Sequence, residues 1–425
     1  MLVLTGLSAV SVATETTTGN STVATLSPPS PALVEFVRTV IAANPRVQAA
    51  RSAVNASGAL QSAAARPLYN PELELEAEDA DADTYTLGIS QTIDWADKRS
   101  ARSAVAAADR LTAEAEYLVT RRTVIAELLT GLAAWQTGAE RHTLAAVRVR
   151  LMQQFAALAK RRFDAGDMPQ AELDLATLVL ADTRMRRSVT EAELVIARQQ
   201  VNNLAPSNAG EQWPKLDARL PSLPVQGDTQ SLLMALPEVQ AAQRRVASAN
   251  ALVALRKREK SVDPTVSLTG GEEDGERLLG LNLSIPLPVR NNFSHEVTAA
   301  YDRYTQAQQL ADDVFRRARA RLMSAAERYR IVHGAWQDWQ QIRQPGLQQQ
   351  GDQLRRLWEA GELSTADFLT QISQVIDSRD SALDLRETLW YAWFEWLAAS
   401  GKVDQWLGAD SLTSTGAARL IRDDG

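Results

Sequence analysis

The chain has 425 residues, a net charge of −7 at pH 7 and no cysteine. Its length is that of two or three ordinary domains, or of one elongated body built by duplication. The acidic balance argues against a nucleic-acid-binding protein, which normally presents a basic face. The absence of cysteine excludes disulfides, thiolate metal ligands and a catalytic cysteine, and we expect no lipid anchor of the lipoprotein type.

The N-terminus resembles part of a secretory signal. Residues 1–13 read MLVLTGLSAVSVA, an apolar run that ends in a small-x-small pattern. We interpret them as a signal-peptide remnant; the alternative is an apolar N-terminus without that role. Residues 14–43 are predicted to be an N-terminal leader, with helix from about Pro31 to Arg66. No other apolar run approaches the ~20 residues of a membrane-spanning helix, so insertion into a membrane would use strands.

Two copies of one unit fill most of the chain. Residues 44–50 recur at 236–242, and residues 87–93 recur at 279–285. Such a long unit must be a complete assembly of helices and strands rather than a solenoid repeat of about 20 to 50 residues. The predicted order is a first repeat at 44–205, a Pro-rich linker at 206–230, a second repeat at 231–400 and a polar C-terminal tail at 401–425.

Each copy is predicted to contain a β-hairpin after its first helix, at 72–95 and at 264–287. In both hairpins apolar side chains alternate with polar ones, which is typical of strands with one apolar face. We expect the apolar face to contact lipid through nine residues: Leu73, Leu75, Leu87, Ile89, Val266, Leu268, Leu279, Leu281 and Leu283.

After each hairpin the sequence predicts a long helix, a tight turn and a returning helix. Leu111, Leu118, Ile125 and Leu132 lie seven residues apart, which is coiled-coil spacing. At ~1.5 Å per residue the first long helix would measure on the order of 95 Å, too long for a compact globule. The predicted elements are long helices at 97–162 and 292–358, tip turns at 163–168 and 359–364, and return helices at 169–204 and 365–400.

Four strands cannot close a barrel, and an open sheet edge is excluded from lipid. If the hairpins enter a membrane, several chains must therefore share one barrel. The alternative is a soluble helical protein whose hairpins pack on its own helices, such as a periplasmic coiled-coil scaffold.

Several motifs resemble the TolC-type outer membrane efflux protein family. They are the duplicated layout, the sequence IDWADKR at residues 93–99 and the Arg162-Phe163-x-x-Gly166 turn. The sequence IPLPVRN at residues 285–291 resembles the heavy-metal branch, typified by CzcC and CusC. The resemblance implies an α+β membrane protein with a long coiled-coil helical tunnel and four transmembrane strands per chain. In a trimer these strands form a shared twelve-stranded barrel.

The same resemblance implies the partners and the location. They are two further copies in a homotrimer, outer membrane lipid, a periplasmic adaptor protein and, through it, an inner-membrane pump of the RND type. The barrel would lie in the bacterial outer membrane and the tunnel in the periplasm. The implied function is a passive exit duct, here for divalent heavy-metal cations. Drug efflux or type I protein secretion on the same fold is the alternative.

Gly166 and Gly361 lie where each long helix must reverse, and glycine adopts a left-handed helix C-terminus without a steric clash. A plain turn explains either residue alone. The resemblance places both turns at the periplasmic mouth, where Arg162, Phe163 and Trp358 would help to contact the adaptor.

Glu172 and Asp367 each follow one of these glycines by six residues. Acidic residues in the first turn of a helix are favoured by its dipole, which is the simpler interpretation. In the family, matching positions line the narrow end of the tunnel. Three chains would gather six carboxylates there, and such rings confer cation preference.

No residue pattern indicates catalysis, a cofactor or a resident metal. Asp79, Asp81 and Asp83 begin like a calcium-binding loop, but Thr84 and Ser90 stand where that loop needs Gly and Glu. The three histidines have no ligand spacing. Trp390, Trp393 and Trp396 form a helix stripe expected to pack in the interior or between subunits.

Overall fold

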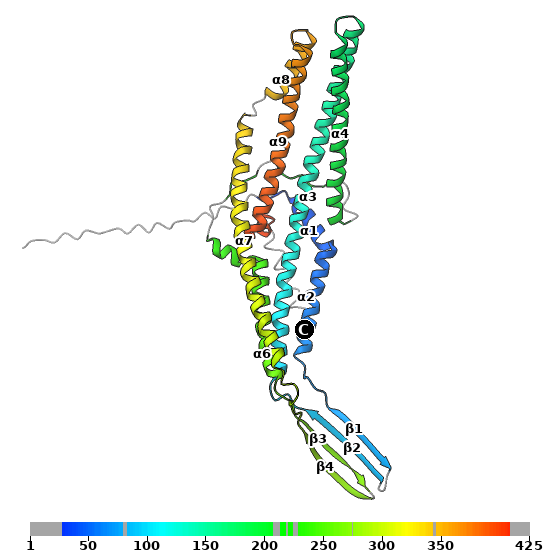
Figure 1. Ribbon diagram of the computed structural model, residues 1–425, viewed down its shortest axis with the longest axis vertical. Coiled ribbons are helices and arrows are strands. Elements are labelled where there is room, and N and C mark those ends of the chain that lie inside the picture. The colour runs from blue at the N-terminus through cyan, green and yellow to red at the C-terminus, as the bar shows by residue number, and fades with distance from the viewer. Residues whose placement is uncertain are drawn as a thin grey trace, which may run out of the picture.

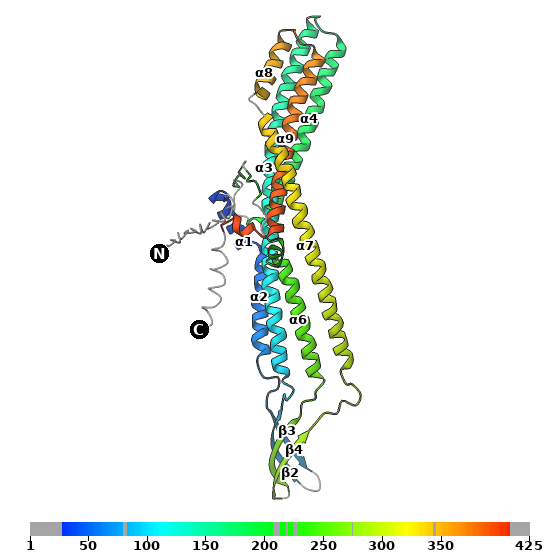
Figure 2. The ribbon, with the colours of Figure 1, turned by 90° about the vertical axis from the view of Figure 1, so that its left-hand side faces the viewer.

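The computed structural model describes residues 28–79, 83–206, 213–217, 220–223, 228–273, 275–342 and 346–408. The molecule is elongated, with four strands at one end and two helical tips at the other (Figures 1 and 2). The expected signal-peptide remnant and part of the acidic loop at 79–83 lie outside the described residues. The first and last described helices lie beside the middle of the molecule (Figure 2).

The described chain begins with two helices, where the sequence predicted one helical stretch from about Pro31 to Arg66. Helix α1 spans Pro31–Ala43 and helix α2 spans Pro45–Ala64. Asn44 separates them because its side chain accepts a hydrogen bond from the Arg46 amide at 3.0 Å, and Pro45 follows at the first helical position. The Asn44 amide also donates to the carbonyl oxygen of Leu204 at 3.3 Å, which ties this break to the end of the repeat.

The two long helices of the first repeat carry it from the strands to its tip. Helix α3 spans Lys98–Asp164, which is 67 residues, and helix α4 returns over Gln170–Leu204. Leu128, Leu129 and Leu132 of α3 are fully buried, whereas α4 exposes apolar residues such as Leu178 and Met185. Helix α3 contacts α2 and α6 near the strands, and α4 and α9 toward the tip.

The second repeat follows the same plan with one break more than expected. It contains α5 (Thr229–Met234), α6 (Pro237–Glu259), α7 (Ser294–Ile342), α8 (Gly346–Glu359) and α9 (Thr365–Ser400). The sequence predicted one helix over 292–358, and the structure has two, α7 and α8. Residues 343–345, between these two helices, lie outside the described residues.

The strands form one antiparallel sheet in the order β1-β2-β3-β4. Their bounds are Glu72–Asp79, Asp83–Thr92, Thr265–Glu273 and Glu276–Ser284. Pairing between β2 and β3 joins the hairpins of the two repeats, and Ile89 faces Leu268 across that junction. The two hairpins therefore form one continuous sheet.

The helices enclose two apolar cores. The larger lies at the middle of the molecule and contains Trp390, Trp393 and Trp396 of α9; the smaller lies near the tips and contains Phe155, Trp358 and Phe368. The linker and the tail contribute to the larger core, because Trp213 and Trp406 are buried there. The prediction of a simply polar tail after Gly401 was therefore wrong for helix α10 (Val403–Trp406).

Within the described ranges, none of the helices is long and apolar enough to cross a membrane.

Candidate functional site

The sheet has one continuous apolar face. Residues paired across an antiparallel sheet project to the same side, and Leu73, Ile89, Leu268 and Leu281 pair in one row across all four strands. Eight of the nine residues predicted to face lipid are exposed, and Val266 is half-buried. An exposed apolar surface of this extent requires a partner of low polarity.

The opposite face of the sheet is polar. It carries serine, threonine and asparagine on β2, β3 and β4, and a series of glutamates on β1: Glu72, Glu74, Glu76 and Glu78. Ser90 and Ser267 are buried on this side. The sheet thus separates an apolar environment from an aqueous one.

Both edges of the sheet are open in the described part of one chain. Strand β1 pairs only with β2, and β4 pairs only with β3. Unpaired backbone groups on an edge strand cannot be satisfied by lipid. The same sheet that presents an apolar face therefore needs two further strand partners.

The IDWADKR segment connects β2 to α3. The Asp94 carboxylate accepts hydrogen bonds from the backbone amides of Lys98 and Arg99, each at 2.8 Å. It thus supplies acceptors for two amides that have no partner within the 67-residue helix. Asp97 adopts φ 55°, a left-handed conformation that aspartate tolerates better than most residues. Arg258 donates to the Asp97 carboxylate at 2.7 Å.

A buried carboxylate joins three of the connections between helices and sheet. Asp263 accepts hydrogen bonds from Lys98 Nζ at 2.8 Å and from the Tyr69 hydroxyl at 2.7 Å. The hydrogen bond to Asp263 raises the pKa of Tyr69 to about 12, so the phenol remains neutral. The sequence alone does not reveal this cluster, because its members lie 165 and 194 positions apart and only the fold brings them together.

The two tip turns have the same backbone geometry. Gly166 and Gly361 have φ values of 82° and 81°. In each turn the glycine amide donates three residues back, and the next amide donates five residues back at 2.8 and 2.9 Å. This is the Schellman pattern that ends a helix with a left-handed glycine, so both residues lie where the sequence required them.

Trp358 does not lie on the surface of the tip. It is 3% exposed and packs between Phe155 and Phe368, with ring centroids 4.6 and 5.0 Å away. The ring therefore offers little surface to an adaptor and stabilises the tip from inside. Phe163 is half-buried against the same core.

Arg162 joins the tips of the two repeats. Its guanidinium lies 5.3 Å from the centre of the Trp358 ring and donates to the carbonyl oxygens of Trp358 and Glu359, both at 3.3 Å. A cation over an indole face that also bonds two C-terminal carbonyls is favoured by both interactions. Arg162 is half-buried, so only part of it can reach a partner.

Glu172 and Asp367 differ in what they bind. Asp367 lies in the first turn of α9, where its amide donates to the Ser364 hydroxyl oxygen at 3.1 Å and the Ser364 hydroxyl donates to its carboxylate at 2.6 Å. This is the arrangement of a helix cap. Glu172 lies half-buried in the first turn of α4, and its side chain has no hydrogen bond among the described residues.

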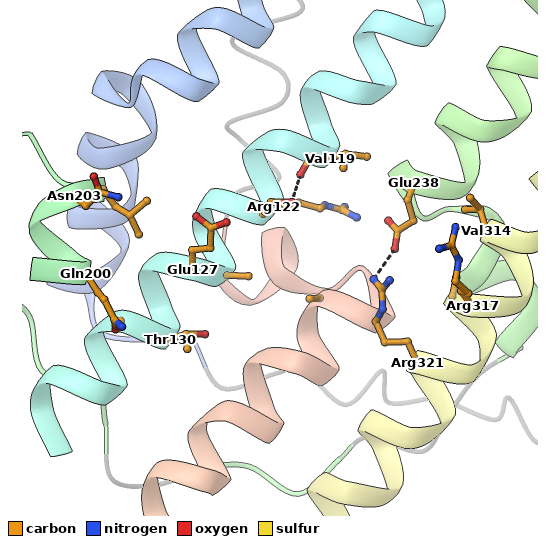
Figure 3. Close-up of a pocket in the computed structure, with 16 residues that line it drawn as sticks. Val119, Arg122, Glu127, Thr130, Gln200, Asn203, Glu238, Val314, Arg317 and Arg321 are labelled. Carbon is orange, nitrogen blue, oxygen red and sulfur yellow. Dashed lines mark hydrogen bonds and ion pairs between the residues drawn. The ribbon is translucent and has the colours of Figure 1, made fainter. Parts of the chain in front are cut away.

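A cavity of about 840 Å³ lies between the two repeats, lined by α3, α6, α7 and the ends of α4 and α9. Figure 3 shows Glu238 of α6 directed toward Arg321 of α7, and the two form an ion pair at 3.5 Å. Arg122 on the opposite wall pairs with Asp404 of α10 at 3.1 Å. The charged groups of this cavity thus link the repeats to each other and to the C-terminal helix.

Further ion pairs link α3 to α9. Arg141 pairs with Asp384 and lies near Asp380 and Glu387, and Arg148 pairs with Asp377 at 3.0 Å. Among the described residues, no group of three or more histidine, aspartate or glutamate side chains is arranged to hold a metal ion.

Comparison with known families gives a match over residues 37–205 to the family described as "Outer membrane efflux protein". These residues include the whole first repeat. Comparison with curated proteins found no match.

Solved channel structures share the fold over nearly the whole chain. The Campylobacter jejuni CmeC outer membrane channel is 12% identical with a TM-score of 0.78, covering 94% of this chain and 93% of that one. CusC, solved in a study of folding and transmembrane channel formation, is 16% identical with a TM-score of 0.72, covering 87% and 92%. The open state of the Neisseria gonorrhoeae MtrE outer membrane channel is 14% identical with a TM-score of 0.71, covering 87% and 89%.

The fold of this chain, with its amphipathic sheet, is therefore the fold of these solved outer membrane channels. Residues 37–205 resemble the outer membrane efflux protein family.

Proposed function

We propose that three copies of this chain form one exit duct of a tripartite efflux system. The observation that carries the proposal is the four-stranded sheet with one apolar face and two open edges. Strand β4 of each copy pairs with β1 of the next, which closes twelve strands into a barrel and leaves no edge in the lipid. The polar face then lines the lumen.

The mass of the assembly tests this proposal. The full chain, extracted in a mild detergent, should have a protein mass near three chains, because one chain cannot satisfy its sheet edges in an apolar environment. Light scattering combined with refractive index separates protein from bound detergent. A stable, monodisperse monomer would contradict the shared barrel. Extraction from membranes without detergent would instead favour the soluble scaffold.

At the other end of the molecule, we assign the two tips to a periplasmic adaptor that links the duct to an inner-membrane pump. Gly166 and Gly361 are exposed at the ends of their helices, while Arg162 and Phe163 are only partly accessible. The support is the presence of two equivalent turns on one chain, which a trimer would present six times around its mouth.

The proposed cargo is a divalent heavy-metal cation. Its support is the IPLPVRN segment at residues 285–291, which resembles the heavy-metal branch. In a host deleted for its own duct, the chain and its cognate pump and adaptor should restore growth on zinc, cobalt, cadmium, copper or silver salts. Restored resistance to organic drugs alone would replace this cargo with drug efflux.

A further inference from the structure

The apolar face of the sheet is too short for a bilayer if it ends where strand pairing ends. At about 3.3 Å per residue, the apolar positions of β4 from Leu279 to Leu283 cover about 13 Å, whereas the apolar band of a membrane barrel is about 25 Å tall. The apolar band ends at Leu279 on the side of the hairpin turns, because the next pair on the same face of the sheet is Glu272 with Arg277, which are both charged. The missing length must come from the side of the helices.

The sequence continues the apolar alternation on that side, beyond the last paired residue. After Leu283 come Ile285, Leu287 and Val289, and Leu287 and Val289 are 76% and 84% exposed. In the first repeat Gln91 interrupts the alternation after Ile89, and Ile93 and Trp95 resume it; Trp95 is 60% exposed. An extended chain from Leu279 to Leu287 covers about 26 Å, which matches the apolar band.

The backbone of these extensions has few free donors, as a lipid contact requires. Pro286 and Pro288 have no amide hydrogen. The amide of Val289 donates to the carbonyl oxygen of Leu287 at 2.9 Å, that of Trp95 donates to Ile93 at 3.0 Å, and that of Ile93 donates to Pro264 at 2.9 Å.

Basic residues follow the apolar ones. Arg99 and Arg290 are exposed, and neither forms an ion pair within the described part of the chain. Tryptophan at a membrane interface, with arginine just beyond it, is the arrangement that anchors a protein at the headgroup level of anionic lipid.

We infer that Trp95, Leu287 and Val289, with Arg99 and Arg290, form a lipid-binding collar that lies in the periplasmic leaflet of the membrane. The collar binds acyl chains through its apolar residues and the phosphates of anionic phospholipids through its arginines. The membrane boundary then lies at the beginning of α3 and α7 rather than at the end of the paired strands. This inference rests on the proposed function, since it places the boundary of the same barrel.

Single cysteines can test the collar, because the chain has none of its own. Nitroxide labels at Leu287→Cys and Val289→Cys are compared with Leu281→Cys on the apolar face and Asn282→Cys on the polar face. The full chain is reconstituted in vesicles of phosphatidylethanolamine and phosphatidylglycerol. Collisions of each label with oxygen, which partitions into lipid, are measured against collisions with a water-soluble nickel complex.

Labels at 287 and 289, like the label at 281, should have a higher oxygen-to-nickel ratio than the label at 282. A lipid signal at 281 with an aqueous signal at 287 and 289 would overturn the collar and leave the barrel intact. Low accessibility to both reagents at 287 and 289 would show that a neighbouring copy covers them, which also overturns it. An aqueous signal at 281 would instead refute the proposed membrane duct.

The arginines are tested with spin-labelled phosphatidylglycerol, whose immobilised fraction reports lipid bound to the protein. Arg99→Gln with Arg290→Gln should reduce selectivity for phosphatidylglycerol over phosphatidylcholine, by up to about fivefold for each arginine removed. Arg184→Gln with Arg187→Gln, exposed positions on α4, removes the same charge far from the sheet and should leave selectivity unchanged. Equal loss in both variants would contradict a headgroup site.

Discussion

Leu281 and Asn282 are neighbours in β4 that project to opposite faces of the sheet. Leu281 pairs with Leu268 in the apolar row, and Asn282 pairs with Ser267 on the polar side. Because side chains alternate along a strand, these adjacent residues lie on opposite faces, Leu281 on the apolar one and Asn282 on the polar one.

We expect Leu281→Arg to lower the stability of the barrel by about 2 to 4 kcal/mol, the cost of an arginine near the middle of the bilayer. The amount of heat-modifiable trimer in outer membrane fractions measures the effect. Asn282→Arg is the matched control, since its charge would enter the aqueous lumen. Equal loss of trimer in both variants would contradict the assigned faces.

Glycine is required at the tips for its conformation, not for its small size. A Cβ atom built on Gly166 or Gly361 would meet no atom within 4 Å, but both residues have a left-handed φ. Spatial crowding therefore does not explain these glycines, and the turn itself does. Sequence alone identified both positions because a long helix that reverses needs such a residue.

Among the elements, the connection between helices and sheet depends on Asp263. The side chains of Lys98 and Asp263 are 11% and 4% exposed, so each would be a buried charge without the other. Tyr69 also donates to Asp263. The cluster therefore fixes the relative positions of three segments between helices and strands: the one before β1, the one after β2 and the one before β3.

Asp263→Ala should lower the free energy of unfolding by about 3 to 5 kcal/mol, because Lys98 would remain charged without its partner. Thermal unfolding in detergent, followed by circular dichroism, measures the loss. The double variant Lys98→Met with Asp263→Leu removes both charges and should recover much of the stability. If the double variant is no better than Asp263→Ala, charge burial is not the cause.

Helix α10 is short, but it completes the larger core. Trp406 is 4% exposed, and Asp404 of the same helix pairs with Arg121 at 2.9 Å. Trp406→Ala should cost about 3 to 5 kcal/mol, as for other buried tryptophans. The melting temperature should fall accordingly, while Gln405→Ala, on the exposed side, should leave it within the error of measurement. An unchanged melting temperature for Trp406→Ala would show that α10 does not stabilise the core.

For the whole molecule, periodicity and duplication were sufficient to predict the arrangement of helices and strands. Alternation along single strands located both hairpins, and the offset between repeats located both tips. The break between α1 and α2 was missed, although Asn44 and Pro45 mark it in the sequence. The Asp263 cluster and the packing of Trp358 on Phe155 could not be predicted, because each joins residues more than 160 positions apart.

In the proposed trimer, Glu172 and Asp367 of the three chains would lie at the mouth of the duct. In one chain, Ser364 caps α9 and its hydroxyl donates to the Asp367 carboxylate, so this carboxylate has a structural role whether or not it faces the lumen. Glu172 has no such bond among the described residues. The constriction proposal therefore depends more on Glu172 than the sequence alone suggested.

If six carboxylates converge in the trimer, their repulsion is relieved by cations, and the duct should conduct cations in preference to anions. Glu172→Gln with Asp367→Asn removes this field with little change in size. In planar bilayers the double variant should lose cation selectivity and block by divalent ions, because both require the negative charges. Glu172→Gln alone should retain the cap at Ser364 and still weaken selectivity. The opposite result, unchanged selectivity with stability reduced by the roughly 0.3 to 1 kcal/mol of a helix-terminus charge, would identify both acids as ordinary first-turn residues.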